Sequence, residues 1–212
     1  MQRIAFAILL CVLSSQPAGA TSRGNFREGY QALLRRDYDK AIEHLTRAID
    51  IGDLARATQA LAYHYRGALY LKRERDDEAI QDLDRALALN PRLATAYSDR
   101  GIAHRRKGQY ELAIADYSQA IRLWPEWHDW YLHRGIALSA IGRHDEAIAD
   151  YGTALSLRPN LVSALVARGD AHLAKGETAN AIADFRRAMT LDRDLAVTYP
   201  SVPEKLARLA VP

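Results

Sequence analysis

Apolar and polar positions along this chain repeat with a period of 34 residues. The stretch RGIAHRRKGQYELAIADY, residues 100–117, is followed by RGIALSAIGRHDEAIADY, residues 134–151. Each copy predicts two amphipathic helices, and runs of β-branched residues that would favour strands are few. The pattern therefore indicates an all-helical protein built from copies of one unit.

Four copies share this register. Each has an Arg-Gly pair, an alanine twelve residues after the glycine, a bulky residue and a second alanine, and three copies add a proline. The pairs are Arg66-Gly67, Arg100-Gly101, Arg134-Gly135 and Arg168-Gly169; the first alanines are Ala79, Ala113, Ala147 and Ala181. The bulky residues are Leu83, Tyr117, Tyr151 and Phe185; the second alanines are Ala86, Ala120, Ala154 and Ala188; the prolines are Pro91, Pro125 and Pro159.

A fifth copy precedes these four. Gly29, Tyr38 and Ala41 open it in the same register, thirty-eight residues ahead of the next set, so four extra residues lie within residues 53–59. We expect them to lengthen the start of the following helix. Gly52 would end the helix before it, and Asp53 would cap the next one.

The order small, small, aromatic, small at this spacing resembles the tetratricopeptide repeat over about residues 22–195. The family's aromatic at the fourth position of the unit corresponds to Tyr63, Tyr97 and Tyr131, with Leu165 in the last unit. The resemblance implies an all-α fold, namely a right-handed superhelical solenoid of five helix-turn-helix units with a C-terminal capping helix.

The register also gives the expected domain boundaries. Unit 1 with its short insertion covers residues 22–59, and units 2 to 5 cover 60–93, 94–127, 128–161 and 162–195. LAVTY at 195–199 repeats the phase of LATAY at 93–97, so a sixth unit begins and is stopped by Pro200 and Pro203. Residues 196–212 then form an aborted repeat and a capping helix, which we expect over 204–209.

The repeat glycine and the repeat arginine predict specific contacts between helices. A glycine inside a helix costs about 1 kcal/mol relative to alanine, so we expect Gly101 to let its helix approach Ala113 and Ala120 closely. Each repeat arginine also precedes an aspartate by sixteen residues, as Arg134 precedes Asp150. Because unit 1 replaces both members, with Glu28 and His44, we predict an ion pair between helices at these positions.

The first twenty residues, MQRIAFAILLCVLSSQPAGA, differ from the repeats. Arg3, an apolar run and a small-residue ending form the pattern of a secretory signal peptide, which predicts cleavage after Ala20 and a periplasmic or secreted protein. The apolar run is too short to span a bilayer. Lipidation at Cys11 is the rival interpretation, although a lipoprotein signal has a small residue before the cysteine and this chain has leucine there. Cleavage after Ala20 would leave the mature protein without a cysteine.

Charge and motifs exclude several function classes. The formal net charge of +3 comes from interleaved acids and bases, which is not the footprint of a nucleic-acid-binding protein. No nucleophile, P-loop or dinucleotide-binding motif occurs, so we expect no enzyme and no cofactor. We also expect no metal site, because none of the histidines has ligand spacing: His44, His64, His104, His128, His133, His144 and His172.

The resemblance implies where a partner would bind. In the family, the first helix of each unit lines the concave face, and the positions that commonly face it hold His64, Tyr65, Lys72, Ser98, Asp99, Arg105, Arg106, Asp129, Leu132, His133, Val166 and Asp170. The clamp with which some members hold a terminal carboxylate is absent, because its places hold Phe26, Tyr30, Tyr65, Thr95 and Asp99.

WPEWHDW, residues 124–130, contains all three tryptophans of the chain. Trp124, Trp127 and Trp130 either thicken the joint between units 3 and 4 or anchor a partner protein, since tryptophan is enriched at interface hot spots. We expect Trp124 to be exposed.

These patterns predict an exported, non-catalytic scaffold or adaptor that binds a protein or peptide segment in its concave groove. The alternative is a self-assembling structural component of the cell envelope, a homo-oligomer without a peptide ligand. A hydrolase would require catalytic groups that the sequence does not show.

Overall fold

The computed structural model describes residues 21–192 and 194–209. The expected signal peptide, with Cys11 and the cleavage position after Ala20, lies outside these ranges. Within them every regular element is an α-helix, which confirms the all-α class. The chain divides between Asp99 and Arg100 into two compact units, and each unit is described by itself.

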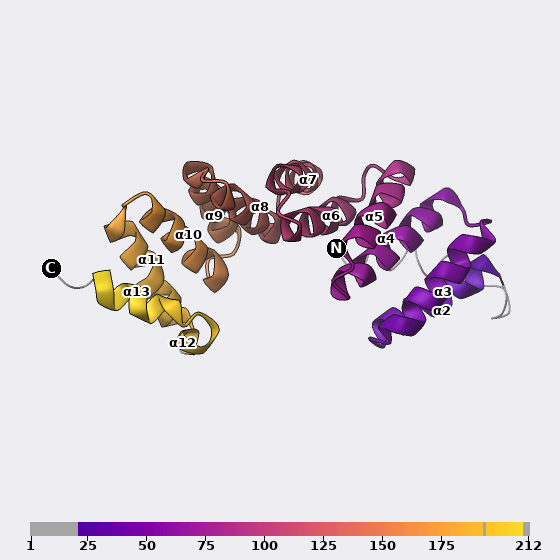
Figure 1. Cartoon of the computed structure of the whole chain (residues 1–212), viewed down its shortest axis with the longest axis horizontal. Coiled ribbons are helices and arrows are strands. Elements are labelled where there is room, and N and C mark those ends of the chain that lie inside the picture. Colours follow the sequence, from indigo (N-terminus) through magenta and orange to yellow (C-terminus); the bar gives the residue numbers. More distant parts are fainter. Residues whose placement is uncertain (1–20, 193, 210–212) are drawn as a thin grey trace. The chain divides into compact units, whose positions relative to one another are not determined.

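The first unit contains α2 (Ser22–Leu34), α3 (Tyr38–Ile51), α4 (Arg56–Lys72), α5 (Asp76–Leu89) and the first half of α6 (Ala94–Arg106). Consecutive helices pack against each other, α2 on α3, α3 on α4 and α4 on α5 (Figure 1). Leu45, Leu69 and Leu83 are fully buried between them. The repeated alanines leave room for this close packing, because Ala41, Ala79 and Ala86 are also fully buried.

The four extra residues between the first and second repeats have only some of the expected effects. Gly52 adopts φ +79° and ends α3, and α4 has 17 residues whereas α6, α8 and α10 have 13, so the ending and the lengthening are confirmed. The predicted cap is wrong. Ala55 precedes α4 without a side-chain cap, and Asp53 instead accepts a hydrogen bond from Ser22 at the start of α2.

The second unit continues from Arg100. It contains α7 (Tyr110–Leu123), α8 (His128–Ala140), α9 (His144–Leu157), α10 (Val162–Ala174), α11 (Thr178–Leu191), α12 (Leu195–Thr198) and α13 (Ser201–Leu209). Within it α7 packs on α8, α8 on α9, α9 on α10 and α10 on α11. Pro125 and Pro159 follow the ends of α7 and α9 by two residues, as Pro91 follows α5. Proline therefore ends these helices as predicted.

The interior glycines make room for a large side chain of the second helix. A Cβ added at Gly135 would lie 2.6 Å from Cε1 of Tyr151, and one at Gly101 would lie 2.9 Å from Cε1 of Tyr117. Gly67 meets Leu83 in the same way. At Gly101 the atoms nearest to an added Cβ all belong to the ring of Tyr117, and the expected close approach to Ala113 and Ala120 stays a prediction.

The predicted arginine–aspartate pairs are present in all four units that carry them. Nε and Nη2 of each arginine donate to the two oxygens of its aspartate at 2.6–2.9 Å: Arg66–Asp82, Arg100–Asp116, Arg134–Asp150 and Arg168–Asp184. In unit 1, Oε2 of Glu28 lies 3.3 Å from Nδ1 of His44. The exchange of both members therefore keeps an acidic and a basic residue in contact, with the acid now on the first helix.

The C-terminal segment closes the second unit. The aborted repeat forms only the four-residue α12, and α13 packs on α11 and α12 with Val202 fully buried. The helix begins at Ser201, three residues before the expected 204. Pro203 falls in its first turn, where a missing N–H removes no helical hydrogen bond. None of the described helices is long and apolar enough to cross a membrane.

Candidate protein-binding surface

In the first unit, the predicted groove residues of α4 and α6 form local polar contacts. His64 is 8% exposed, and its Nε2 lies 2.9 Å from Oδ2 of Asp99. Ser98, the residue before Asp99, is buried, with 6% of its surface exposed. Lys72 is exposed and its Nζ lies 5.7 Å from the ring centre of Tyr38. Of these residues, Asp99 and Lys72 leave part of their charged groups open to a partner.

The positions of the absent carboxylate clamp are occupied by an aromatic cluster. The Tyr65 ring lies 5.4 Å from that of Tyr30 and 6.2 Å from that of Phe26, measured between centroids. Burial, with a smaller contribution from Tyr30, raises the pKa of Tyr65 to about 12. Tyr65 therefore stays a neutral hydroxyl at physiological pH, and this surface offers ring faces and hydroxyls instead of the positive charges of a clamp.

In the second unit, the structure brings together Arg105 of α6 and Asp129 and His133 of α8. The His133 ring lies 5.8 Å from the Tyr117 ring in a nearly parallel arrangement. Burial, followed by the charge of Arg105, lowers the pKa of His133, and Asp129 opposes this shift. Within the described chain, neither Nε of Arg105 nor Nδ1 of His133 has a hydrogen-bond partner, although both atoms are buried.

Other predicted groove residues of this unit lie elsewhere. Leu132 and Val166 are each 6% exposed and belong to the core, so their assignment to the groove is corrected. Arg106 is exposed at the end of α6. Asp170 pairs with Lys205 of α13, so the capping helix covers part of the surface at this end.

The three tryptophans divide into one core residue and two surface residues. Trp130 is 4% exposed, whereas Trp124 and Trp127 are 49% and 46% exposed, as predicted for Trp124. Trp124 follows the last residue of α7, and Trp127 precedes the first residue of α8. Only Trp124 and Trp127 are therefore available to a partner.

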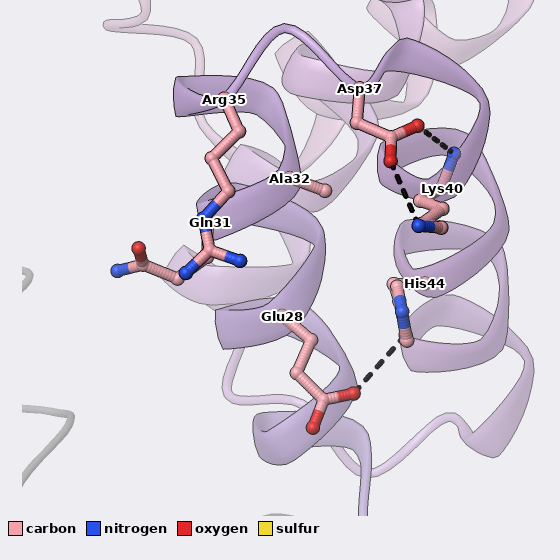
Figure 2. A pocket seen from close by; sticks show the side chains of 7 residues that line it. All are labelled: Glu28, Gln31, Ala32, Arg35, Asp37, Lys40 and His44. Carbon is pink, nitrogen blue, oxygen red and sulfur yellow. Dashed lines mark hydrogen bonds and ion pairs between the residues drawn. The ribbon is translucent and has the colours of Figure 1, made fainter.

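A cleft of about 460 Å³ lies between α2 and α3, and the sequence analysis did not anticipate it. Glu28 and His44 face each other across it, Asp37 binds Lys40 at the start of α3, and Gln31 and Arg35 extend from α2 (Figure 2). The sequence signal at this place was the exchange of the arginine–aspartate pair for Glu28 and His44, two residues that line the cleft.

The buried acidic side chains of the described residues have structural partners and do not gather into a metal site. Across residues 21–192 and 194–209, no three His, Cys, Asp or Glu side chains come together as a metal site would require. The buried carboxylates Asp82, Asp116, Asp150 and Asp184 are all bound to arginine and hold helices together.

Comparison with known proteins agrees with this architecture. A crystal structure of MamA matches with a TM-score of 0.73 and 24% identity over 84% of this chain and 94% of that chain. A MamA structure from Desulfovibrio magneticus RS-1 matches with a TM-score of 0.75 and 18% identity over 84% and 98% of the two chains. A third structure, of MamA AMB-1, matches with a TM-score of 0.68 and 26% identity over 79% of this chain and 96% of that chain.

Family models give a sequence-based assignment. No protein of the curated set matches the chain at a significant level. A tetratricopeptide repeat model matches residues 98–160 and 132–196, and a second TPR repeat model matches residues 67–108. Together these matches extend over residues 67–196, more than half of the chain, which is the part from the end of α4 to the start of α12. The chain belongs to the tetratricopeptide repeat family.

Proposed function

We propose that this chain is an exported, non-catalytic scaffold that binds a segment of a partner protein on the first helices of its repeats. The family and the fold support a protein-interaction role. Export is supported by the sequence of residues 1–20, with its single Arg3, apolar run and Ala18-Gly19-Ala20 ending.

One observation carries the binding proposal. Nε of Arg105 and Nδ1 of His133 are buried and make no hydrogen bond to the described chain. Leaving such a group unpaired costs about 1–3 kcal/mol, and buried polar groups in proteins are nearly always paired. A carboxylate or carbonyl oxygen of a bound segment that displaces the side chains around them would accept from Nε of Arg105 and, in the tautomer with a proton on Nδ1, from His133. The arginine would make a charge-assisted bond with a carboxylate.

Asp129 sets the limits of this surface. Its side chain is 42% exposed, and its Oδ1 lies 3.1 Å from Nδ1 of His128, the residue before it on the same helix. It would repel an acid placed directly against it and accept from a backbone N–H of the segment. The surface therefore favours an extended segment with one acidic side chain over a strongly acidic run.

The experiment uses the full-length chain with a C-terminal tag, expressed in a Gram-negative bacterium. Fractionation and N-terminal sequencing test export, and we expect a periplasmic product that begins at Thr21. Pull-down from periplasmic extract is then compared between the wild type, Arg105→Glu and the control Arg122→Glu, which makes the same charge change at an exposed position of α7.

A partner retained by the wild type and by Arg122→Glu but lost with Arg105→Glu supports the proposal. Equal capture by all three baits contradicts the assigned surface. Capture of the chain alone contradicts partner binding and supports the self-assembling alternative. Circular dichroism of Arg105→Glu separates lost binding from lost folding.

A further inference from the structure

The joint between α7 and α8 has an unusual aromatic composition. In other joints the place of Trp130 is held by Ala96 or Ala164, both buried, and the place of Trp127 is held by Leu93, Leu161 or Leu195. Trp124 replaces Asn90, Arg158 or Asp192. A large ring therefore fills a place that suits a methyl group elsewhere, and two further rings lie outside it.

The rings support one another. The centroid of Trp130 lies 6.2 Å from that of Trp124, with 24° between the planes, and 6.1 Å from that of Trp127. Trp127 is also stacked on His128 with an interplanar angle of 5°. Because Trp130 is buried, it holds the two exposed rings from below, so little side-chain entropy remains to be lost when a partner contacts them.

The charge beside the rings is negative and unpaired. Glu126 lies between Trp124 and Trp127 in the sequence, is exposed, and has no hydrogen-bond or ion-pair partner in residues 21–192 and 194–209. On α8, Nε2 of His128 lies 3.4 Å from Nη1 of Arg158. An indole face attracts cations more strongly than any other side-chain ring, so rings and carboxylate favour the same kind of ligand group.

The size of the patch limits the occupant. A tryptophan presents roughly 250 Å² at most, so two half-exposed rings offer on the order of 250 Å² together. A stable protein–protein interface needs about 800 Å² on each side. The patch is too small to hold a second copy of the chain by itself, and it suits one anchoring side chain of a short segment.

We propose that Trp124, Trp127 and Glu126 form a docking site for an arginine or lysine side chain in a short segment of a partner protein. The cation lies over the exposed indole faces, and Glu126 pairs with it from the side. Arginine binds better than lysine, because the planar guanidinium stacks on a ring and is less strongly hydrated. This site uses other residues than the Arg105 and His133 surface, and it stands without that proposal.

The chain provides its own reporter, since all three tryptophans lie within residues 124–130. Indole fluorescence of the full chain therefore reports on this joint alone. The probes are end-capped tetra-arginine, tetralysine and tetraglutamate peptides. We expect a saturable emission change with tetra-arginine, a weaker one with tetralysine and none with tetraglutamate. The net charge of +3 works against non-specific attraction of the cationic probes.

Two variants test the assignment. Glu126→Gln should weaken tetra-arginine binding at least fivefold, whereas Glu204→Gln, the same change at an exposed position of α13, should leave it unchanged. Trp124→Ser should also weaken binding while the thermal transition stays cooperative. Equal responses to the cationic and anionic probes, or equal affinity in Glu126→Gln and the wild type, would overturn the proposal.

Discussion

Arg134 binds Asp150 through two parallel hydrogen bonds of 2.7 Å, and its third nitrogen donates to Oγ of Ser118 at 3.0 Å. One arginine of α8 thus holds the second helix of its own repeat and the second helix of the repeat before it. Arg66 does the same with Asp82 and Thr46. The arginine–aspartate pair therefore stabilises both the repeat and its junction with the preceding repeat.

Removal of the acid should be costly. Asp150 is 6% exposed, so Asp150→Ala leaves the Arg134 charge partly buried without its partner. Breaking a buried pair on one side costs about 3–5 kcal/mol, and since Arg134 retains some contact with water we expect a loss of about 2–4 kcal/mol in the free energy of unfolding. Urea denaturation measures it.

The matched control is Asp145→Ala, which removes an exposed carboxylate paired with Lys175. Exposed pairs contribute about 0–1 kcal/mol, so this variant should unfold close to the wild type. If the two variants lose the same stability, the Arg134–Asp150 pair is not a stabilising junction.

Arg168 binds Asp184 in the same way, but within residues 21–192 and 194–209 it makes no hydrogen bond to the preceding repeat, and a substitution can supply one. Gly152 occupies the place of Ser118 and Thr46, and a Cβ added there would lie 3.9 Å from Nη1 of Arg168. Gly152→Ser should raise the free energy of unfolding by about 1 kcal/mol, from helix propensity and the new hydrogen bond together. Thermal denaturation is the measurement.

Gly152→Ala is the control for this prediction. Alanine is the better helix former by roughly 0.5 kcal/mol, so propensity alone would make the alanine variant the more stable. A serine variant that equals or exceeds it indicates the hydroxyl bond to Arg168. A clearly less stable serine variant argues against that bond.

The turn after α4 contains backbone strain. Glu74 has φ +58°, whereas the same place in later repeats holds Gly108, Gly142 and Gly176 with φ between +72° and +78°. A left-handed conformation costs a side chain about 1–2 kcal/mol, partly offset because glycine makes the unfolded chain more flexible. Glu74→Gly should therefore stabilise the protein by up to about 1 kcal/mol, seen as a higher melting temperature. Glu74→Ala keeps its Cβ and should give no such increase.

The sequence contained enough information for features that repeat. The Arg134–Asp150 pair was predictable because unit 1 exchanges both members, which identifies them as partners without any structure. The side chain that packs against Gly101 was not predictable, because periodicity places a residue on a helix face but does not say which opposing side chain lies nearest. The atoms nearest to a Cβ at Gly101 belong to the ring of Tyr117.

Features that occur once were harder to predict. Asp53 has the right chemistry for a cap, but the helix begins at Arg56 and its side chain bonds to Ser22 instead. The tryptophans cross a turn, where the helical period is interrupted, so the sequence did not reveal that Trp130 points into the core and Trp127 out of it. The unpaired Arg105 and His133 atoms required the packing of α6 near α8.

The binding surface should show its own pH dependence. Burial and Arg105 lower the pKa of His133 from its usual 6.5, so the folded protein binds its proton less readily than the unfolded chain does. Below pH 6.5 the unfolded state therefore carries more protons, and the contribution of neutral His133 to stability, fully present above that pH, is lost as the pH falls toward the lowered pKa. His133→Gln should flatten the decline in unfolding free energy between about pH 7 and pH 5.

Arg105→Gln should raise the pKa of His133, measured by NMR titration of the ring resonance that disappears in His133→Gln. An unchanged pKa in Arg105→Gln would show that the two side chains do not interact, and the binding surface assigned to them would lose its support.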